Sequence, residues 1–406
     1  MNRKFAERLE NLGTETAFAV GAEAAELSAK GEKVYPFHLG DLNIRTPDNI
    51  IEAAVEAMKD GKTGYCPNAG IAPLRDALAR DVGNARGLVY DQENVSVQTG
   101  GKPVIGKFIM SLMDPGDEVL YPNPGYPIYE SMIKFNGGVA KPYGFIETET
   151  GFALDFEGIR QQISSRTKIF IYNNYHNPTS AESDDQEMKE LAEFCIENDL
   201  YVLSDESYFD IVYEGKGKSI ASLPGMQERT VILYTFSKKF AMTGWRLGAA
   251  IGPRDIISQI SRLNVNDESC TNQFVQWAAV EALTGPQDDP QKILDVLKER
   301  RDVAVDILDS IEGITVHRPN STFYLFPNVT GAMEKLGISD VEEFRKVILD
   351  KTGVSFTTRK HFGTPLEGEK EQYVRLAYSG ITKEEIKEGL EKMKNFIEST
   401  DTCTTV

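Results

Sequence analysis

A lysine and an arginine stand eight positions apart after one apolar run of this 406-residue chain. The run TVILYTF (230–236) leads directly to Ser237 and Lys238, and Arg246 follows shortly after. An amine at the end of a strand can form a Schiff base with an aldehyde if burial and a cationic neighbour keep it unprotonated. A guanidinium presents planar donors that match phosphate oxygens. The segment therefore predicts covalent chemistry beside a phosphate site.

Polar groups also end three other apolar runs: Gly100, Gly101 and Lys102; Asn177; and Asp205 with Tyr208. The glycine pair opens a helix, whose free N–H groups and positive dipole end suit a phosphate. An aspartate is what an aromatic ring nitrogen needs if it is to stay protonated and withdraw electrons. Phosphate, aldehyde and ring nitrogen together describe pyridoxal 5′-phosphate (PLP).

Short apolar runs alternate with charged, helix-period stretches between residues 95 and 252. The predicted strands are VSVQT (95–99), EVLYP (118–122), KIFIYN (168–173), YVLSD (201–205), TVILYTF (230–236) and LGAAIG (247–252). The stretch 184–199 has its apolar residues on one helical face. This alternation predicts an α/β fold with a mainly parallel sheet covered by helices on both sides. Ligands of such sheets bind at the carboxyl ends of the strands.

A second, smaller α+β domain is predicted downstream. Helical sequence at 290–311 leads into apolar runs at 314–318, 322–329, 353–358 and 373–379. We expect an N-terminal segment joining the small domain (1–45), a large cofactor domain (46–288), the small domain (289–400) and a frayed tail (401–406).

The composition disfavours other classes of partner. The chain has 44 basic and 62 acidic side chains, a net charge of −18, which would repel nucleic acid. Its start has no apolar leader, and no stretch is apolar enough for a membrane span, so we expect a cytoplasmic protein. Cys66, Cys195, Cys270 and Cys403 show no metal-ligand spacing and are predicted to be reduced thiols without metal.

Motifs along nearly the whole chain resemble the class I/II aminotransferases of PLP fold type I. They are HLGDLNIRTP (38–47), GYCPNAGIAPLRDAL (64–78), TGGK (99–102), PGDEVLYPNPGYPIY (115–129), NYHNPTS (174–180), SDESY (204–208), TFSK (235–238), GWRLG (244–248), FYLF (323–326) and YVRLAYS (373–379). Within the family, the GGK form is similar to bacterial aspartate aminotransferases of the prokaryotic subgroup.

The resemblance implies a role for each matching residue around the cofactor ring. Lys238 would hold PLP as a Schiff base and later move a proton as general acid and base. Asp205 would pair with the ring nitrogen, and Asn177 and Tyr208 would hydrogen-bond the phenolic oxygen. Tyr126 would stack on the ring.

The resemblance also implies the groups at the two ends of the site. Gly100, Gly101, Lys102, Thr235, Ser237 and Arg246 would surround the phosphate. Tyr65 would reach the phosphate of a neighbouring subunit, which implies a homodimer with shared active sites. Arg375 would bind the substrate α-carboxylate as a bidentate pair, beside Asn177 and the backbone of Gly40.

The sequence departs from the family pattern at three places that matter. Thr235 replaces a Ser or Gly, and Ser180 replaces the glycine of NPTG, so the turn must tolerate a side chain. SFTTRKHFG (355–363) replaces the usual loop beside the substrate side chain. Arg359 in this loop and Lys102 favour a dicarboxylic amino acid, and we expect His361 and His176 near the site.

The predicted function is transfer of an amino group from an L-amino acid to a 2-oxo acid, such as 2-oxoglutarate, by a ping-pong mechanism. Three alternatives stay open: a neutral or aromatic substrate lined by Tyr126, Phe209 and Phe323, a PLP-dependent β-lyase, and a non-catalytic regulatory protein on the same fold. Lys239 is a rival to Lys238, but it breaks the spacing to Arg246.

Overall fold

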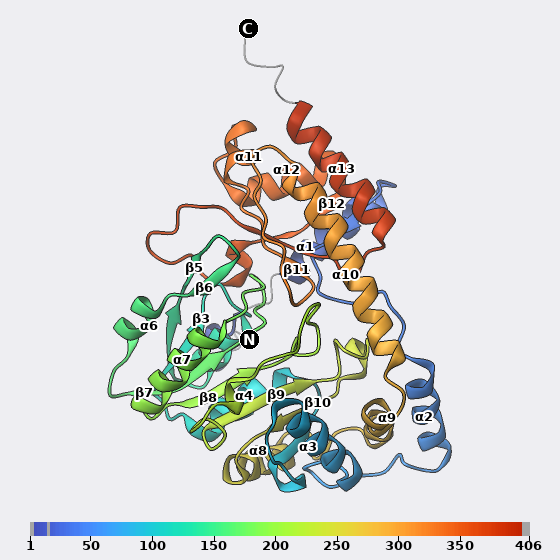
Figure 1. The fold of residues 1–406 in the computed structure, drawn as a ribbon, viewed down its shortest axis with the longest axis vertical. Helices are drawn as coiled ribbons and strands as arrows, with labels where there is room; N and C mark the ends of the chain where they lie inside the picture. Colours follow the sequence, from blue (N-terminus) through green and yellow to red (C-terminus); the bar gives the residue numbers. More distant parts are fainter. Residues whose placement is uncertain (1–3, 14–16, 400–406) are drawn as a thin grey trace.

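The structure is a computed structural model that describes residues 4–13 and 17–399. Figure 1 shows a large lobe around a central sheet and a small lobe above it, with the long helix α10 (Asp288–Asp309) running from one to the other. The predicted domain boundary at 288/289 falls at the first turn of this helix. The tail predicted to fray lies outside the described residues.

The large lobe is built on a seven-stranded sheet. In spatial order the strands are β2 (Val95–Gln98), β10 (Gly248–Ile251), β9 (Thr230–Thr235), β8 (Tyr201–Asp205), β7 (Thr167–Tyr172), β3 (Glu118–Pro122) and β4 (Val139–Tyr143). All are parallel except β10, which is antiparallel to both neighbours. The predicted mainly parallel sheet is confirmed. The edge strand β4 was not predicted, because its sequence VAKPY is half-exposed and has no apolar run.

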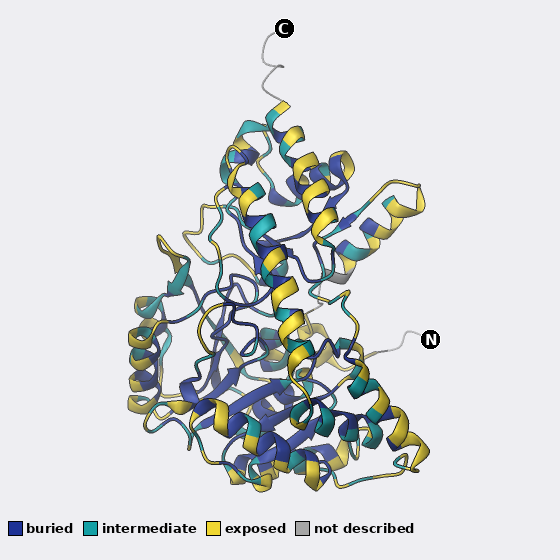
Figure 2. Ribbon diagram, turned by 45° about the vertical axis from the view of Figure 1, so that its right-hand side comes forward, coloured by how far each residue is buried: buried dark blue, intermediate teal, exposed yellow. Residues whose placement is uncertain are grey.

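Helices cover both faces of the sheet, and Figure 2 shows the strands buried between helices with exposed outer faces. They are α2 (Asp48–Lys59), α3 (Ala72–Arg86), α4 (Lys102–Leu112), α5 (Ile128–Phe135), α6 (Phe156–Gln162), α7 (Asp185–Glu197), α8 (Arg254–Asn266) and α9 (Gln273–Thr284). In β7, Ile169 and Ile171 join the core with α4 and α8, while Phe170 and Tyr172 join the core with α7. Successive side chains alternate between faces, so an apolar run is needed to bury both.

The small lobe has a three-stranded antiparallel sheet of β11 (Tyr324–Leu325), β14 (Val374–Ala377) and β13 (Thr357–Thr358). Around it lie α1 (Ala17–Ala29), α11 (Thr330–Lys335), α12 (Val341–Thr352), α13 (Lys383–Ser399) and the 3₁₀ helix η5 (Arg359–Phe362). Strand β1 (Tyr35–Pro36) pairs in parallel with β12 (Val354–Ser355), which attaches the N-terminal segment to this lobe. The run expected as a strand at 314–318 makes only a single bridge, between Thr315 and Asn328.

Smaller elements complete the chain: the hairpin β5 (Phe145–Glu147) and β6 (Phe152–Leu154), and the 3₁₀ helices η1 (Glu7–Asn11), η2 (Gln92–Asn94), η3 (Ile220–Ser222) and η4 (Thr243–Trp245). Within residues 4–13 and 17–399, no helix has the length and apolar character to cross a membrane. The cytoplasmic location stays a prediction.

The fold brings two cysteines together that are far apart in the sequence. The backbone N–H of Cys66 donates to Sγ of Cys270 at 3.5 Å, across a sequence separation of 204. Both are free thiols, as is the buried Cys195, whereas Cys403 lies outside the described residues. No group of His, Cys, Asp or Glu side chains in the described part of the chain could hold a metal ion.

Candidate active site

A cavity of about 310 Å³ lies at the edge of the central sheet, below the small lobe. Strand ends of the large lobe form one wall, and Tyr324, His361, Phe362 and Arg375 of the small lobe form the other. Most residues predicted for the site line it: Gly40, Gly101, Lys102, Tyr126, Asn177, Asp205, Tyr208, Thr235, Ser237, Lys238, Arg246 and Arg375.

The direction of β10 explains why Lys238 and Arg246 share this cavity. Lys238 follows β9, so it lies at the carboxyl edge of the parallel strands. Arg246 precedes β10, but β10 runs antiparallel and its first residue, Gly248, pairs with Thr235 at the end of β9. The start of β10 therefore lies at the same edge as the end of β9.

The start of α4 and the Arg246 guanidinium form one end of the cavity. Gly100 has φ 103°, and a Cβ built there would lie 2.3 Å from Nη2 of Arg246. Only a glycine lets the guanidinium lie against the loop that opens the helix. Beside it, Oγ1 of Thr235 donates to Oγ of Ser237 at 2.9 Å and accepts from its backbone N–H at 3.2 Å. This end offers mainly donors, which is the chemistry that a phosphate requires.

Lys238 extends into the middle of the cavity. Its Nζ donates to the carbonyl oxygen of Gly40 at 3.1 Å and lies 5.2 Å from the ring centroid of Phe323. A Cβ on Gly40 would lie 2.2 Å from Oη of Tyr324, so the close approach here also requires glycine. Lys239, the rival Schiff-base lysine, instead pairs with Asp210 at 3.4 Å and is not among the cavity-lining residues.

Asp205 is a buried carboxylate held by three donors. Tyr129 Oη donates to Oδ2 at 2.6 Å, while Oγ and the backbone N–H of Ser207 donate to Oδ1 at 2.6 and 3.1 Å. Burial raises the pKa of Asp205 above its ordinary value, although these hydrogen bonds and the charge of Lys238 oppose that rise. The three donors stabilise the ionised carboxylate, and a cationic ring nitrogen facing it would do the same.

Arg375, on β14, lies at the other end of the cavity. Its Nη2 donates to the carbonyl oxygen of His38 at 2.8 Å, and Nη1 donates to Oδ1 of Asn177 at 3.1 Å. Its Nε is buried and has no partner among the described residues. The guanidinium carbon lies 4.5 Å from the ring centroid of Tyr324 and 4.7 Å from that of Phe362. A guanidinium fixed in this way is suited to binding a carboxylate.

The structure does not bring Arg359 into the cavity, and its contact with the substrate stays a prediction. Nε and Nη2 of Arg359 donate to the two carboxylate oxygens of Glu369 at 2.9 and 2.7 Å. Nη1 donates to the carbonyl oxygen of Gly363 at 3.0 Å. Arg359 therefore joins the two ends of the segment 359–369. A buried guanidinium of this kind needs a paired carboxylate. Tyr65 also lies outside the cavity and is 90% exposed.

The turn after Asn177 accommodates the unexpected serine. Ser180 has φ 58°, the left-handed conformation that normally favours glycine. Its Oγ lies 2.6 Å from Oγ1 of Thr322 and donates to the carbonyl oxygen of Tyr324 at 2.9 Å. These bonds tie the turn to the small lobe. His176, expected near the site, is buried beneath this turn, with Nδ1 2.7 Å from Oγ1 of Thr179.

Sequence reasoning missed several groups that line the cavity: Tyr129, Ser207, Tyr324 and Phe362. All except Phe362 have polar side chains, and Tyr129, Ser207 and Tyr324 stand inside motifs already singled out. His361 was expected only near the site, and it lies two positions after the arginine that was assigned instead. Periodicity could not choose between them, because η5 spans only four residues.

Comparisons with known proteins agree with this geometry. The family model for "Aminotransferase class I and II" matches residues 33–393. The chain is 35% identical to the probable aspartate/prephenate aminotransferase of Aquifex aeolicus over 98% of this chain and 100% of that protein. The aspartate aminotransferase structure from Rhizobium meliloti has a TM-score of 0.91 at 28% identity, covering 98% and 99% of the two chains.

The aspartate aminotransferase of Thermus thermophilus with maleate has a TM-score of 0.88 at 30% identity, covering 97% and 99% of the two chains. Relatives and solved structures thus share the whole length of this chain and its fold. The protein belongs to the class I and II aminotransferase family, has the PLP fold type I architecture and is an enzyme that transfers amino groups.

Proposed function

We propose that this enzyme uses PLP to move an amino group from a dicarboxylic L-amino acid to a 2-oxo acid by a ping-pong mechanism. One observation carries the proposal: Lys102, Lys238, Arg246 and Arg375 all line one cavity of a chain with a net charge of −18. A cofactor phosphate and two substrate carboxylates would use such a concentration of positive charge.

The residues present fit PLP. Gly100 leaves the space that Arg246 needs, so its guanidinium and the first N–H groups of α4 would hold the phosphate. Asp205 would face the ring nitrogen, and Lys238 would hold the aldehyde carbon. When bound, the protonated pyridine ring would withdraw electrons from the carbon that carries the amino group.

The remaining steps depend on the protein's own side chains. Arg375 would orient the substrate through its α-carboxylate, with Asn177 holding Nη1 in place. Once the substrate amino group has replaced Lys238 Nζ at the aldehyde carbon, the freed Nζ would take the proton from Cα of the substrate and deliver it to that carbon, and it would move a proton the opposite way when the 2-oxo acid is converted. A positioned general base of this kind accelerates proton transfer by about 10²–10⁴-fold.

Lys102 supports the dicarboxylic substrate. It is the first residue of α4 and lines the cavity, with Nζ 5.6 Å from the ring centroid of Tyr126. A relative of known structure contains maleate, which is a dicarboxylate. A charged pocket discriminates strongly, because an apolar side chain leaves its groups unpaired. The alternatives of a neutral or aromatic substrate, a β-lyase and a regulatory protein are not favoured.

Steady-state kinetics with a panel of amino acids against 2-oxoglutarate tests the proposal. We expect kcat/KM for aspartate to exceed that for alanine and phenylalanine by at least about tenfold. Glutamate alone should convert bound PLP to pyridoxamine phosphate, measured by absorbance. Release of ammonia and pyruvate from a cysteine conjugate without amino transfer would contradict the proposal and support a lyase.

We also propose a homodimer in which Tyr65 serves the partner's cavity. The Tyr65 side chain supports this because it is 90% exposed and therefore accessible to a second subunit. Sedimentation should give twice the chain mass of 45.2 kDa. Tyr65→Phe should weaken PLP binding about tenfold, as for one lost hydrogen bond to a charged group. Hybrids with a Lys238→Ala chain should regain one site of normal affinity, whereas a monomer would contradict the proposal.

A further inference from the structure

His361 is a cavity residue that the proposed function does not use. It belongs to η5 in the small lobe and lines the cavity beside Phe362 and Arg375. Its side chain is 10% exposed. The loop that carries it is fixed to the large lobe, because the backbone N–H of Gly125 donates to the carbonyl oxygen of Phe362 at 2.9 Å.

The hydrogen bonds of the ring fix where its proton lies. The backbone N–H of Thr358 donates to Nδ1 of His361 at 3.1 Å. An amide N–H can only donate, so Nδ1 must present a lone pair and the proton of the neutral ring lies on Nε2. The described part of the chain provides no hydrogen-bond partner for Nε2.

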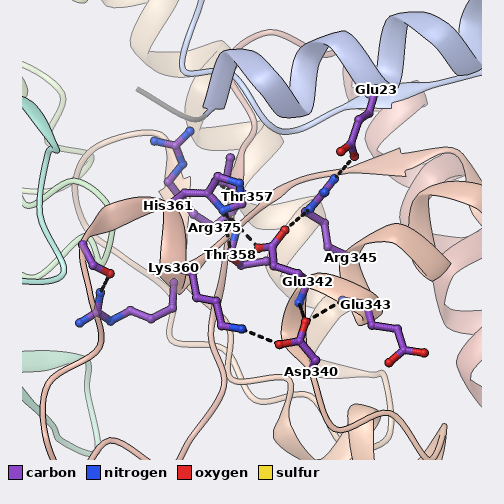
Figure 3. Close-up of polar contacts among 12 residues, drawn as sticks. Glu23, Asp340, Glu342, Glu343, Arg345, Thr357, Thr358, Lys360, His361 and Arg375 are labelled. Atoms are coloured by element: carbon purple, nitrogen blue, oxygen red, sulfur yellow. Dashed lines mark hydrogen bonds and ion pairs between the residues drawn. The ribbon is translucent and has the colours of Figure 1, made fainter. Parts of the chain in front are cut away.

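A network of charged side chains holds the ring in this orientation (Figure 3). Oγ1 of Thr358 lies 2.9 Å from Nδ1 and donates to Glu342. Glu342 accepts from Nε of Arg345 at 2.9 Å, and Nη1 of Arg345 donates to Glu23 of α1 at 2.7 Å. Side chains of α1 and α12 thus support the loop that carries His361.

Burial favours the neutral form of His361. It lowers the pKa of His361 against the opposing charge of Glu342, and the positive charges of Arg345 and Arg375 act in the same direction as burial. A neutral ring adds a donor beside Arg375 without adding another positive charge. Nε2–H of His361 therefore lines the same cavity as the Arg375 guanidinium, which has only N–H donors to offer and uses one each of Nη1 and Nη2 on Asn177 and His38.

We propose that His361 is a recognition residue that donates its Nε2–H to a carboxylate of the substrate bound beside Arg375. A ligand group that meets two donors there must be an acceptor, and a carboxylate has two oxygens to offer. The inference rests on the proposed function for the substrate class. The carboxylate is either the α-carboxylate, which every amino acid has, or the distal one, which only dicarboxylic substrates have.

Two variants of the PLP-loaded enzyme test this. His361→Leu removes the donor, and His361→Gln places an amide N–H at a similar reach. We expect His361→Leu to raise the Kd of maleate and the KM of aspartate about ten- to hundredfold, as for a lost hydrogen bond to a charged group, with little change in kcat. His361→Gln should recover part of this loss. Lys360→Ala is the matched control, because Nζ of Lys360 pairs with Asp340 at 2.5 Å and does not line the cavity.

The choice of substrates separates the two carboxylates. A loss of binding for maleate and aspartate but not for alanine identifies the distal carboxylate, and an equal loss for alanine and aspartate identifies the α-carboxylate. A maleate Kd within twofold of the unsubstituted enzyme in the folded His361→Leu variant would overturn the role of His361. The proposed substrate class fails separately, if the unsubstituted enzyme does not prefer aspartate over alanine.

Discussion

The two walls of the cavity differ in how their functional groups are held. The large-lobe wall consists of residues at the ends of buried strands, such as Lys238 after β9 and Asp205 at the end of β8. The small-lobe wall consists of Tyr324 on β11, Arg375 on β14 and the short helix η5. Strand register fixes the first wall, whereas side-chain bonds of Thr358 and Lys360 to α12 and its N-cap Asp340 hold the η5 part of the second.

This difference decides which residues motif reasoning can identify. Strands of a parallel sheet end at one edge, so any polar residue directly after a buried run is placed there by the fold. The position of a charged loop residue depends on the partner with which it forms an ion pair. Arg359 pairs with Glu369, whereas His361, two residues later, lines the cavity. We therefore expect a substitution at Lys238 in the large-lobe wall to change kcat, and a substitution at Arg359 behind the small-lobe wall to change stability.

The largest effect is expected at Lys238 on the large-lobe wall. Lys238→Ala removes the proposed Schiff-base and proton-transfer group, and kcat should fall by about four orders of magnitude. Stopped-flow or end-point assays of amino transfer measure this. Lys239→Ala is the control and should stay within about twofold, because its Nζ pairs with Asp210. Full activity of Lys238→Ala would contradict the assignment of the Schiff-base and proton-transfer roles to Lys238 rather than to Lys239.

A smaller effect, on stability rather than on specificity, is expected for Arg359, which lies behind the small-lobe wall and outside the cavity. Arg359→Ala leaves Glu369 unpaired and should lower the free energy of unfolding by about 2 kcal/mol, as for lost charged hydrogen bonds. Denaturant titration measures this change. The ratio of kcat/KM for aspartate to that for alanine should stay within about twofold. A tenfold fall in that ratio would instead make Arg359 a recognition residue.

Acid should lower the stability of the fold through the buried side chain of His38. Burial, together with the charges of Arg375 and Arg345, lowers the pKa of His38 to about 4 in the folded protein, from 6.5. The unfolded chain therefore binds this proton first, and the stability that His38 contributes is lost as pH falls from 6.5 towards about 4. Thermal unfolding across this range should show the loss. His38→Gln should reduce the pH dependence, and an identical pH dependence in this variant would contradict the assignment.

The smallest effect is expected at Ser180, which connects the two walls. Ser180→Ala keeps the left-handed φ but loses the bonds to Thr322 and Tyr324, so the free energy of unfolding should fall by about 1 kcal/mol. Ser180→Gly loses the same bonds but relieves backbone strain of about 1–2 kcal/mol, so it should be more stable than the alanine variant. Equal stability of the two variants would show that the φ of Ser180 costs nothing.

The sequence by itself determined the large lobe and most of its wall. Apolar runs that bury both faces of a strand predicted six of its strands, and the polar residues that follow them line the cavity. The edge strand β4 was not predicted, because most of its side chains are only partly buried and its sequence has no apolar run. Strand order and the antiparallel direction of β10 were not available from the runs either.

The sequence also predicted Arg375 on the other wall, but only the tertiary structure decided the contacts of the loop beside it. It paired Arg359 with Glu369 and placed His361 in the cavity, and in the large lobe it brought Cys66 to Cys270. These contacts join residues whose partners lie in other segments, and no local period records which partner a charged side chain will find. Burial patterns are local and can be read along the chain, whereas the pairing of buried charges depends on the finished packing.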